Sequence, residues 1–372
     1  MRRRHHLNSP KFTLLAQGLE AALAGHQDEA RRTFASLHER LDVDSHPEDM
    51  QYLIFSAALS RRFGDLPAGE LNLYLRRFEL PQIQLFNLLA LRLPTVSLAG
   101  SIANEQLFGL MRGHEVVTLV DVGIGSGRQE VALLHSMAEA NALPRQMTIV
   151  GVEPSADSLR GAEDALTMAA QRLGVVLRFI GIPKGAEDLS EEDWAMLGAL
   201  PGARFMNAAF ALHHIAERQT RQNPRDAFFE QLRRWEPRGV VLCEPNSDHH
   251  RAPIRERFHN CWRHFFLTFQ LIEELDISRQ EKNAMKLFFS REIEDIVGTQ
   301  EEARRFERHE LTELWLGRLE RAGFELVDGP VRSGGDAHPA VKPRSRPGCI
   351  GLEYQGIPLV CVLTARTPER PG

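Results

Sequence analysis

Three glycines at alternate positions mark the stretch of this 372-residue chain that is best suited to hold a ligand. Gly123, Gly125 and Gly127 follow the apolar run "TLVDV" and lead into "RQEVALLHSM", so the pattern predicts a turn from a strand to a helix. A dinucleotide fingerprint needs its third glycine one residue later, where Arg128 stands, and a P-loop needs a lysine followed by serine or threonine. The spacing therefore disfavours both phosphate-binding loops.

Two acidic residues narrow the class of ligand. Asp121 ends the first predicted strand and completes the pattern D-x-G-x-G-x-G, which is typical of class I methyltransferases that bind S-adenosylmethionine, because glycines let the backbone approach a ligand closely. Glu153 ends the next strand, about 26 residues beyond Gly127, where a carboxylate accepts hydrogen bonds from both ribose hydroxyls. Together the motifs predict an S-adenosylmethionine site. The alternative is a tight turn beside an unused crevice, with Glu153 on the surface.

Short apolar runs, separated by stretches long enough for crossover helices, predict a doubly wound parallel sheet. Five strands are expected at residues 116–122, 147–153, 175–182, 204–212 and 239–245. The terminal segment "CIGLEYQGIPLVCVLTA" predicts two further strands joined by a tight turn, which gives the sheet an antiparallel edge. Ligands on such sheets bind beyond the carboxyl ends of the strands. The residues that follow strands four and five are therefore the remaining candidates.

Helical patterns fill the parts of the chain around this sheet. Apolar residues recur at helical spacing from about residue 11 to 113, and about 60 residues of aromatic and charged helix follow the fifth strand. Both segments are expected to form a lid or cap over the ligand crevice. The expected organisation is an N-terminal helical cap region at 1–113, the first part of the core at 114–249, a helical cap insertion at 250–305, and the last helix and terminal strands at 306–372. The stretch "GGDAHPAVKPRSRPG", residues 334–348, is expected to be a Pro-, Gly- and Arg-rich loop.

Composition limits the partners. A formal net charge of -5 offers no general basic footprint, so nucleic acid is not expected as the main partner. Four cysteines without a C-x-x-C pair fit neither a disulfide scaffold nor a zinc site, and no metal is expected. No run approaches the roughly 20 apolar residues of a membrane span. We expect a cytoplasmic protein that acts away from membranes, and a homodimer stays open.

Several longer blocks resemble one known family. "VTLVDVGIGSGRQ" resembles the VHIID-type motif of the GRAS family, "LFNLLALRLPTVSLAGSIANEQLFGLM" resembles the segment before it, and "VVLCEPNSDHHRAPIRERFHNCWRHFF" and "RRFERHELTELWLGRLERAGFELV" resemble later family blocks. The chain thus resembles a bacterial GRAS protein from about Leu85 onward. The resemblance implies a Rossmann-like class I methyltransferase core: a seven-stranded, mostly parallel sheet of order 3-2-1-4-5-7-6 with an antiparallel last strand and a helical cap. The plant relatives are transcriptional regulators that often lack the full glycine pattern, so the three glycines here favour retained cofactor binding.

Strand four is followed by "NAAFALHHIAE". Asn207 and Ala208 are expected to border the cofactor. His214 is the preferred catalytic base and His213 a substrate contact, since imidazole exchanges protons near neutral pH; the alternative is that either histidine only buttresses the loop. If the resemblance holds, Asn104 faces the glycine turn and contacts the cofactor, or it caps a helix.

Strand five is followed by "NSDHH". Glu244, at the end of the strand, is expected to act as a base or to bind a cationic substrate, and the alternative is a salt bridge with an arginine of the cap such as Arg257. Asn246 and His249 are candidate substrate contacts. Trp262 and Arg263 belong to an aromatic helix that lines an apolar substrate pocket or forms ordinary core.

These residues support two main interpretations of function. The first is an S-adenosylmethionine-dependent methyltransferase that acts on a small molecule in a capped crevice, with His214 and Glu244 as catalytic groups. The second is a noncatalytic regulatory or protein-interaction module that still binds S-adenosylmethionine. A nicotinamide oxidoreductase is disfavoured by the glycine spacing and the reversed terminal hairpin.

Overall fold

The computed structural model describes residues 9–64, 82–217, 222–329 and 338–369. The chain divides into two compact units. The helical unit contains Met1–Leu89 and Asp248–Arg308, and the sheet unit contains Ala90–Ser247 and His309–Gly372.

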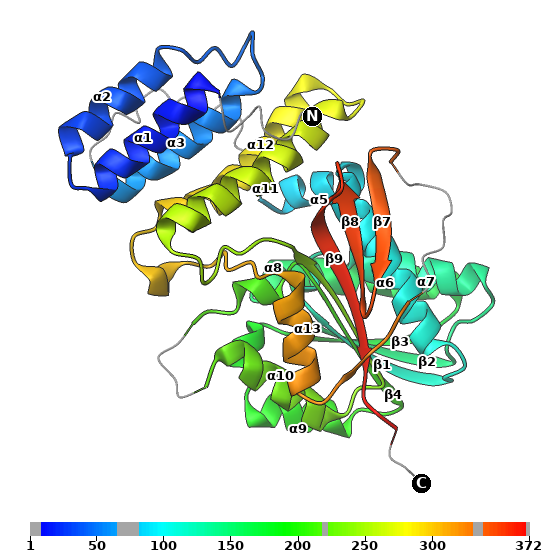
Figure 1. The fold of residues 1–372 in the computed structure, drawn as a ribbon. Coiled ribbons are helices and arrows are strands. Elements are labelled where there is room, and N and C mark those ends of the chain that lie inside the picture. Colours follow the sequence, from blue (N-terminus) through cyan, green and yellow to red (C-terminus); the bar gives the residue numbers. More distant parts are fainter. Residues whose placement is uncertain (1–8, 65–81, 218–221, 330–337, 370–372) are drawn as a thin grey trace. The chain divides into compact units, whose positions relative to one another are not determined.

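The sheet unit is built on one mixed sheet of nine strands (Figure 1). Its order is β3-β2-β1-β4-β5-β9-β8-β7, and β6 pairs with β9 beside this path. The strands from β1 to β5 run parallel, whereas β9 pairs antiparallel with β5, β8 and β6. The bounds are β1 Val116–Val122, β2 Gln146–Val152, β3 Val176–Ile182, β4 Ala203–Ala209, β5 Gly239–Pro245, β6 Glu325–Leu326, β7 Val341–Arg346, β8 Cys349–Tyr354 and β9 Ile357–Arg366.

The predicted α/β fold with a reversed final strand is confirmed, and the seven predicted strands lie in the order 3-2-1-4-5-7-6, but the prediction of seven strands is wrong because two more belong to the sheet in the described residues. The sheet also contains β7, which lies inside the expected loop at 334–348. Pro343 and the alternating charged residues are typical of a loop, so the sequence pattern does not predict this strand. An edge strand tolerates such residues, and β7 pairs with β8 along one side only. Strand four is shorter than predicted. It ends at Ala209, because Phe210 adopts a φ of 56° and a 3-10 turn follows at Leu212–His214.

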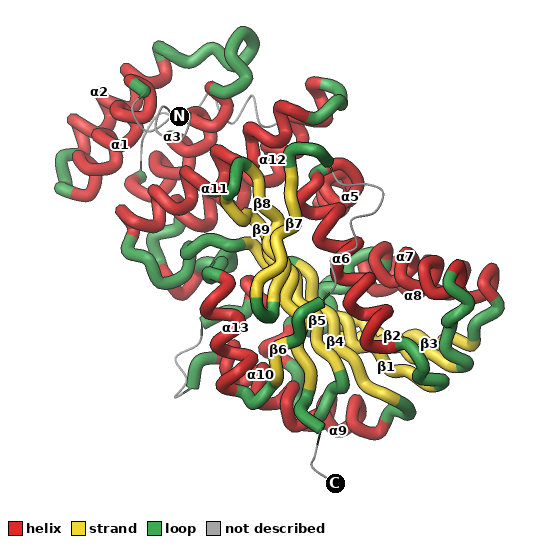
Figure 2. Tube along the Cα trace, turned by 45° about the vertical axis from the view of Figure 1, so that its right-hand side comes forward, coloured by secondary structure: helices red, strands yellow, loops and turns green. Residues whose placement is uncertain are grey.

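Helices cover both faces of this sheet (Figure 2). Helices α6, α7 and α8 pack on one face, and α9, α10 and α13 pack on the other. Local sequence sets their starts: Asn223 caps α10 ahead of Pro224, and Ser190 forms a capping box with Asp193 at α9. The bounds are α6 Pro94–Met111, α7 Arg128–Glu139, α8 Ala156–Leu173, α9 Glu191–Ala199, α10 Pro224–Trp235 and α13 Thr312–Arg321.

The helical unit joins segments from two distant parts of the sequence around one aromatic core. The Trp262 side chain on α11 is fully buried, and its ring lies 4.9 Å from the rings of Phe12 and Tyr52 and 5.0 Å from that of Phe55. Trp262 is therefore a core residue. The bounds are α1 Pro10–Leu23, α2 Gln27–His38, α3 Asp49–Phe63, α11 Ile254–Glu274, α12 Arg279–Ile293 and a π-helical turn at Glu294–Gly298, and α5 Gln82–Arg92 leads from this unit into the other.

No single helix within the described ranges is long and apolar enough to cross a membrane. One pair, residues 85–92 and 94–111, meets the length and composition criteria together but is bent by 75°. The cytoplasmic location stays a prediction.

Candidate functional site

The three glycines of the turn after β1 serve different purposes. All have positive φ, at 78°, 53° and 69° for Gly123, Gly125 and Gly127. A Cβ added at Gly123 would lie 2.6 Å from the Ala211 Cβ, and one at Gly127 would lie 3.2 Å from the backbone of Ala162. At Gly125 it would clash with nothing and would lie 3.9 Å from the Gly123 carbonyl oxygen, an ordinary contact. Packing thus requires the first and third glycines, whereas the second leaves the backbone accessible to a ligand.

Three buried polar side chains lie beneath this turn. Asp121, at the end of β1, accepts a hydrogen bond of 2.5 Å from the Asn207 Nδ2 on β4. Its carboxyl group also shares a hydrogen bond with Glu130 in the first turn of α7. Burial raises the pKa of Asp121 to about 6, although the bonds from Glu130 and Asn207 lower it. Burial, followed by the charge of Asp121, raises the pKa of Glu130 well above its ordinary value. The shared hydrogen bond lowers the pKa of Asp121 and raises that of Glu130, so Glu130 is the donor in this bond.

Glu130 is not among the residues that sequence patterns predicted for this site. The available signal was its place in the helix: Glu130 stands three residues before Leu133 and four before Leu134, both buried core residues, so it lies on the inward face of α7. A charged residue on that face needs a partner, and Asp121 supplies it.

Several oxygen atoms around this pair lack a donor. Within the described part of the chain, the buried atoms Asn207 Oδ1, Glu130 Oε2 and Asn104 Oδ1 have no hydrogen-bond partner. Asn104, on α6, donates its Nδ2 to the Gln129 carbonyl at 2.9 Å and thus lies beside the first turn of α7. Buried acceptors without donors are rare in proteins and point to a missing ligand or water. Ala208, by contrast, faces the hydrophobic core.

Glu153 follows β2 and is half-buried. The Gly123 N–H donates to the Val152 carbonyl at 2.8 Å, so Glu153 directly follows a residue that contacts the turn. One oxygen of its side chain, Oε1, accepts the Ser155 N–H at 3.0 Å. This arrangement holds the carboxylate at the carboxyl end of β2, as the ribose prediction requires.

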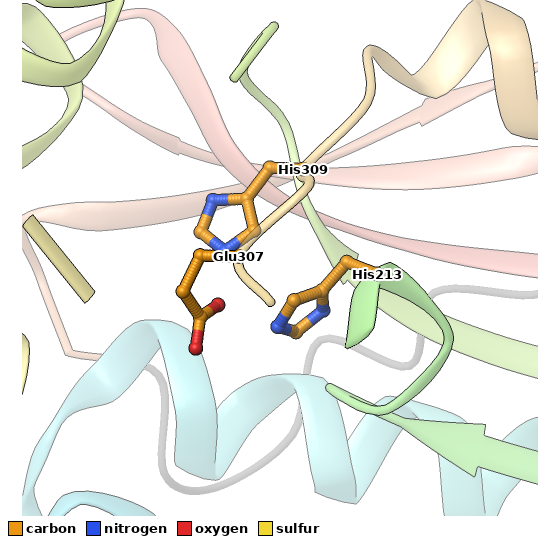
Figure 3. Close-up of side chains that lie close together, drawn as sticks. All are labelled: His213, Glu307 and His309. Atoms are coloured by element: carbon orange, nitrogen blue, oxygen red, sulfur yellow. The ribbon is translucent and has the colours of Figure 1, made fainter. Parts of the chain in front are cut away.

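The region after β4 and β5 is organised around Glu244, which is 1% exposed. Its Oε1 accepts the Leu212 N–H at 2.9 Å, and its Oε2 lies 2.7 Å from the His213 Nδ1. The His213 ring also packs edge-on against His309 at 4.5 Å. Figure 3 draws these two rings, together with Glu307, which precedes His309 by two residues. Glu244 therefore fixes the 3-10 turn, whereas His214 on the same turn is exposed.

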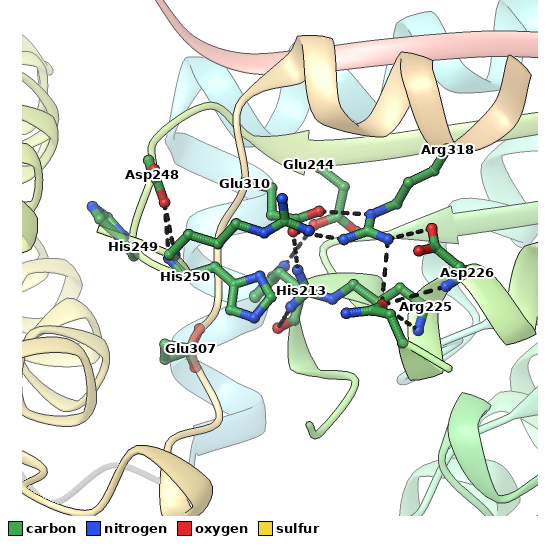
Figure 4. A network of polar contacts seen from close by, with 12 residues as sticks. His213, Arg225, Asp226, Glu244, Asp248, His249, His250, Glu307, Glu310 and Arg318 are labelled. Carbon is green, nitrogen blue, oxygen red and sulfur yellow. Dashed lines mark hydrogen bonds and ion pairs between the residues drawn. The ribbon is translucent and has the colours of Figure 1, made fainter. Parts of the chain in front are cut away.

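A buried ionic network continues from this turn (Figure 4). Arg225 donates to the His213 carbonyl at 2.9 Å and lies 3.2 Å from Glu310. Arg318 makes two bonds to Glu310, at 2.9 and 2.8 Å, and also contacts Asp226. Burial lowers the pKa of Arg225; it also acts to lower that of Arg318, but Glu310 and Asp226 outweigh it and the pKa of Arg318 is raised. Arg225, Glu310 and Arg318 come from α10, the segment before α13, and α13, and sequence spacing gave no sign that they meet.

The alternative considered for Glu244, a salt bridge with an arginine of the cap such as Arg257, does not describe its partner. Glu244 pairs with His213, and Arg257 pairs with Glu302 at 2.6 Å in the helical unit. Asn246 is a structural clamp: its Nδ2 donates to the Pro358 carbonyl at 3.1 Å, and its Oδ1 accepts the Thr312 N–H at 2.9 Å.

The predicted substrate contacts are divided between the units. His213 and Asn246 belong to the sheet unit, and His249, Trp262 and Arg263 belong to the helical unit. The buried His249 ring packs against Phe265, and the Arg263 side chain is exposed.

Comparison with known proteins identifies the family. The model of the GRAS domain family matches residues 12–333. The chain belongs to the GRAS domain family. It is 28% identical over 285 residues to Protein SLENDER RICE1-LIKE 1 of Oryza sativa subsp. japonica, covering 72% of this chain and 56% of that protein. It is also 28% identical over 247 residues to Scarecrow-like transcription factor PAT1 of Arabidopsis thaliana, covering 62% of this chain and 50% of that protein.

A solved GRAS-type structure shows the same fold. The crystal structure of SCL7 from Oryza sativa matches this chain with a TM-score of 0.78 at 22% identity, and the match covers 96% of this chain and 100% of that one. This GRAS chain spans about half the length of the curated relatives it matches.

The relatives correct three parts of the sequence interpretation. They come from plants, so the bacterial origin has no support. One is named a transcription factor and neither is named an enzyme, which contradicts the methyltransferase function and the transferase class for this GRAS chain. A small-molecule substrate likewise has no support. The family resemblance itself is confirmed.

Proposed function

We propose that this GRAS protein is a noncatalytic regulatory module that acts through protein contacts and binds S-adenosylmethionine at its glycine turn. The observation that carries the noncatalytic part is the state of Glu244. A general base must reach the proton of an acceptor, but both carboxylate oxygens of Glu244 are buried and engaged by Leu212 and His213. This carboxylate stabilises the fold.

A named relative and the net charge of the chain support the proposed regulatory role. A relative that is 28% identical to this chain over 247 residues is named a transcription factor. The net charge of -5 gives this chain no general basic surface for the DNA backbone. Contact with proteins is therefore favoured over direct contact with nucleic acid.

The turn after β1 supports the proposed binding of S-adenosylmethionine. Gly125 leaves its backbone open to a ligand, and the acceptors at Asn207 and Asn104 lack donors. In this proposal the backbone at Gly125 contacts the methionyl portion, Glu153 accepts the ribose hydroxyls, and Asp121 with Asn207 holds the amino group. Donors and acceptors of the ligand match those of the residues present.

Calorimetry with S-adenosylmethionine and S-adenosylhomocysteine tests ligand binding. We expect saturable binding of one equivalent to the wild type and its loss in Gly125→Arg, which places a long side chain at the turn where the ligand is proposed to bind. Gly161→Arg is the matched control, because a side chain added at this exposed glycine of α8 meets no atom within 4 Å and lies outside the turn. Absence of binding to the wild type, or equal binding to Gly125→Arg, contradicts the proposal.

A labelled methyl group tests the noncatalytic part. The protein is incubated with methyl-labelled S-adenosylmethionine and either small-molecule or protein extracts, and S-adenosylhomocysteine is quantified. We expect no formation above the rate without protein. Turnover that disappears in Gly125→Arg would restore the enzyme interpretation.

Reconstitution tests the regulatory part. Proteins that co-purify with the chain from its source are expressed separately and mixed with it, and light scattering measures the mass of the complex. We expect a stoichiometric complex with at least one of them. Failure of every candidate to assemble counts against a protein-interaction module.

A further inference from the structure

We propose that the outer edge of β3 is the interface of a symmetric homodimer, in which the β3 strands of two copies pair antiparallel and continue one sheet into the other. The partner at this edge is thus a second copy of the same chain. The inference goes beyond the proposed function, because it concerns another part of the sheet unit and does not depend on a ligand at the glycine turn.

β3 is the outer strand at one end of the sheet (Figure 2). Within the residues that the structure describes, it pairs with β2 alone. An outer strand has backbone N–H and C=O groups on its other side that no neighbouring strand engages, and these groups can pair with a further strand. The backbone of β3 therefore favours another β-strand as its partner.

β3 is apolar in sequence although most of it is accessible to solvent. Five of its seven residues, Val176–Ile182, are valine, leucine, phenylalanine or isoleucine, yet only Ile182 is buried and Val176 is 66% exposed. β1 and β2, by contrast, are buried from their second residue on. Met168, on the neighbouring helix α8, is also 53% exposed. Exposed apolar side chains along an outer strand are typical of a surface that another protein chain covers.

The outer strand at the opposite end of the sheet carries features that hinder pairing. β7 has three exposed cationic side chains, those of Lys342, Arg344 and Arg346, and Pro343 lacks a backbone N–H. Both features oppose the addition of a strand. β3 has one charged residue, Arg178, and no proline. The two edges therefore differ in kind, and β3 is the one suited to pairing.

The sequence of β3 suits pairing with itself. Around a two-fold axis perpendicular to the sheet, opposed residues lie on the same face, so a residue at the axis lies opposite its own copy. Phe179 is the central residue of β3, and it lies on the α8 face: a Cβ added at Gly151 would be 3.1 Å from the Phe179 ring and 3.2 Å from Leu159 of α8. With Phe179 at the axis, two aromatic rings face each other and Arg178 lies opposite Ile180. This register opposes no like charges directly.

Charges on α8 favour the same arrangement. α8 packs on β3, so the two-fold axis places the α8 helices of both copies on one face of the extended sheet, running antiparallel. The first half of α8 carries three exposed carboxylates, Asp157, Glu163 and Asp164, against one arginine, Arg160, whereas the second half carries only Arg172. The acidic half of each helix then lies beside the basic half of the other. A second copy therefore complements this edge in charge as well as in backbone hydrogen bonding.

Light scattering on the full chain at several concentrations tests the dimer. We expect the wild type to reach twice the monomer mass at micromolar concentration, and we expect Val176→Lys to raise the dissociation constant at least about tenfold, because a charge on an outer strand opposes pairing. Leu91→Lys is the matched control: Leu91 is 54% exposed on α5, outside β3 and α8, and its replacement should change the constant less than about twofold. Circular dichroism confirms that both variants are folded. A wild type that stays monomeric, or a Val176→Lys variant that dimerises as the wild type does, would overturn the inference.

Charge reversal on α8 tests the antiparallel orientation. Arg172→Glu places a carboxylate beside the acidic half of the other helix and should weaken the dimer about threefold to tenfold. The double variant Glu163→Arg/Asp164→Arg should weaken it similarly, because it makes the first half basic. Combining all three substitutions restores opposite charges and should return the dissociation constant to within about threefold of the wild type. A triple variant that is weaker than both others contradicts the antiparallel arrangement.

Hydrogen exchange places the interface on the chain. The outward amides of β3 should exchange at least about tenfold more slowly when the concentration is raised above the dissociation constant, because each then has a partner. A mass that doubles without this protection would assign the dimer to another surface and overturn the inference. Protection of β3 that appears only with a different, co-purifying protein would overturn it as well. In each of these cases calorimetry with S-adenosylhomocysteine reports on the proposed function separately.

Discussion

The glycine-turn region and the Glu310 network both bury a carboxylate at the same sheet. They differ in whether the protein supplies that carboxylate with a cationic partner. Beneath the turn, Asp121 has no cationic partner in the described structure, and oxygens of Asn207 and Glu130 lack donors. In the network, Glu310 is bound by two arginines. Buried acceptors without partners can accept hydrogen bonds from a ligand. A buried carboxylate that is already paired with arginines stabilises the fold instead. The comparison separates a site for binding from a site for stability.

The comparison predicts its largest effect at Glu310. In Glu310→Gln, the buried guanidinium groups of Arg225 and Arg318 lose their shared counterion, so we expect the free energy of unfolding to fall by about 3–5 kcal/mol. Urea unfolding monitored by circular dichroism measures this loss. Asp226→Asn is the control: Asp226 is partly exposed, and its loss should cost about 1 kcal/mol. Equal small losses in both variants would show that the network stabilises the fold no more than a surface ion pair.

Gly123→Ala should have the next largest effect on stability. Its Cβ would lie 2.6 Å from the Ala211 Cβ, and alanine is strained at a φ of 78°. We expect a loss of about 2–4 kcal/mol in the same unfolding experiment, and about 1 kcal/mol for Gly125→Ala, which has strain but no clash. A loss at Gly125 as large as that at Gly123 would mean that packing, and not access to a ligand, requires the second glycine.

Local patterns were enough to predict much of the glycine-turn region. Alternating glycines and apolar runs are set by neighbours in the chain, so β1, the turn and the acid after β2 were predictable. The network was not, because Arg225 and Glu310 meet only through the packing of α10 beside α13 on one face of the sheet. Strand β7 escaped prediction because Pro343 and its charges resemble a loop, and an edge strand tolerates both. Asn246 and Ala208, which were assigned to the site from their places at strand ends, are a clamp and a core residue.

The charge beneath the turn makes stability depend on pH. Asp121 has a pKa of about 6 in the folded protein against 3.8 ordinarily, so the folded state takes up this proton first as the pH falls. The cost of burying the charge is full above about pH 6 and fades between pH 6 and pH 4. Asp121→Asn has no such cost. Its stability relative to wild type should therefore decrease by about 1–2 kcal/mol between pH 7 and pH 4.5, measured by urea unfolding at each pH, whereas a constant difference would show that Asp121 titrates normally.

Glu153 should show the smallest effect on stability and still affect binding. Its side chain makes one exposed hydrogen bond, to the Ser155 N–H, so Glu153→Ala should change the free energy of unfolding by less than about 0.5 kcal/mol. The affinity for S-adenosylhomocysteine should nevertheless fall about tenfold, because the carboxylate is the acceptor proposed for the ribose hydroxyls. Glu153→Gln keeps one acceptor and should lie between the wild type and Glu153→Ala when all three are titrated in the calorimeter. A variant that loses stability but not affinity would place Glu153 with Glu310 among the residues that maintain the fold, and would confine the ligand to the Asp121 side of the turn.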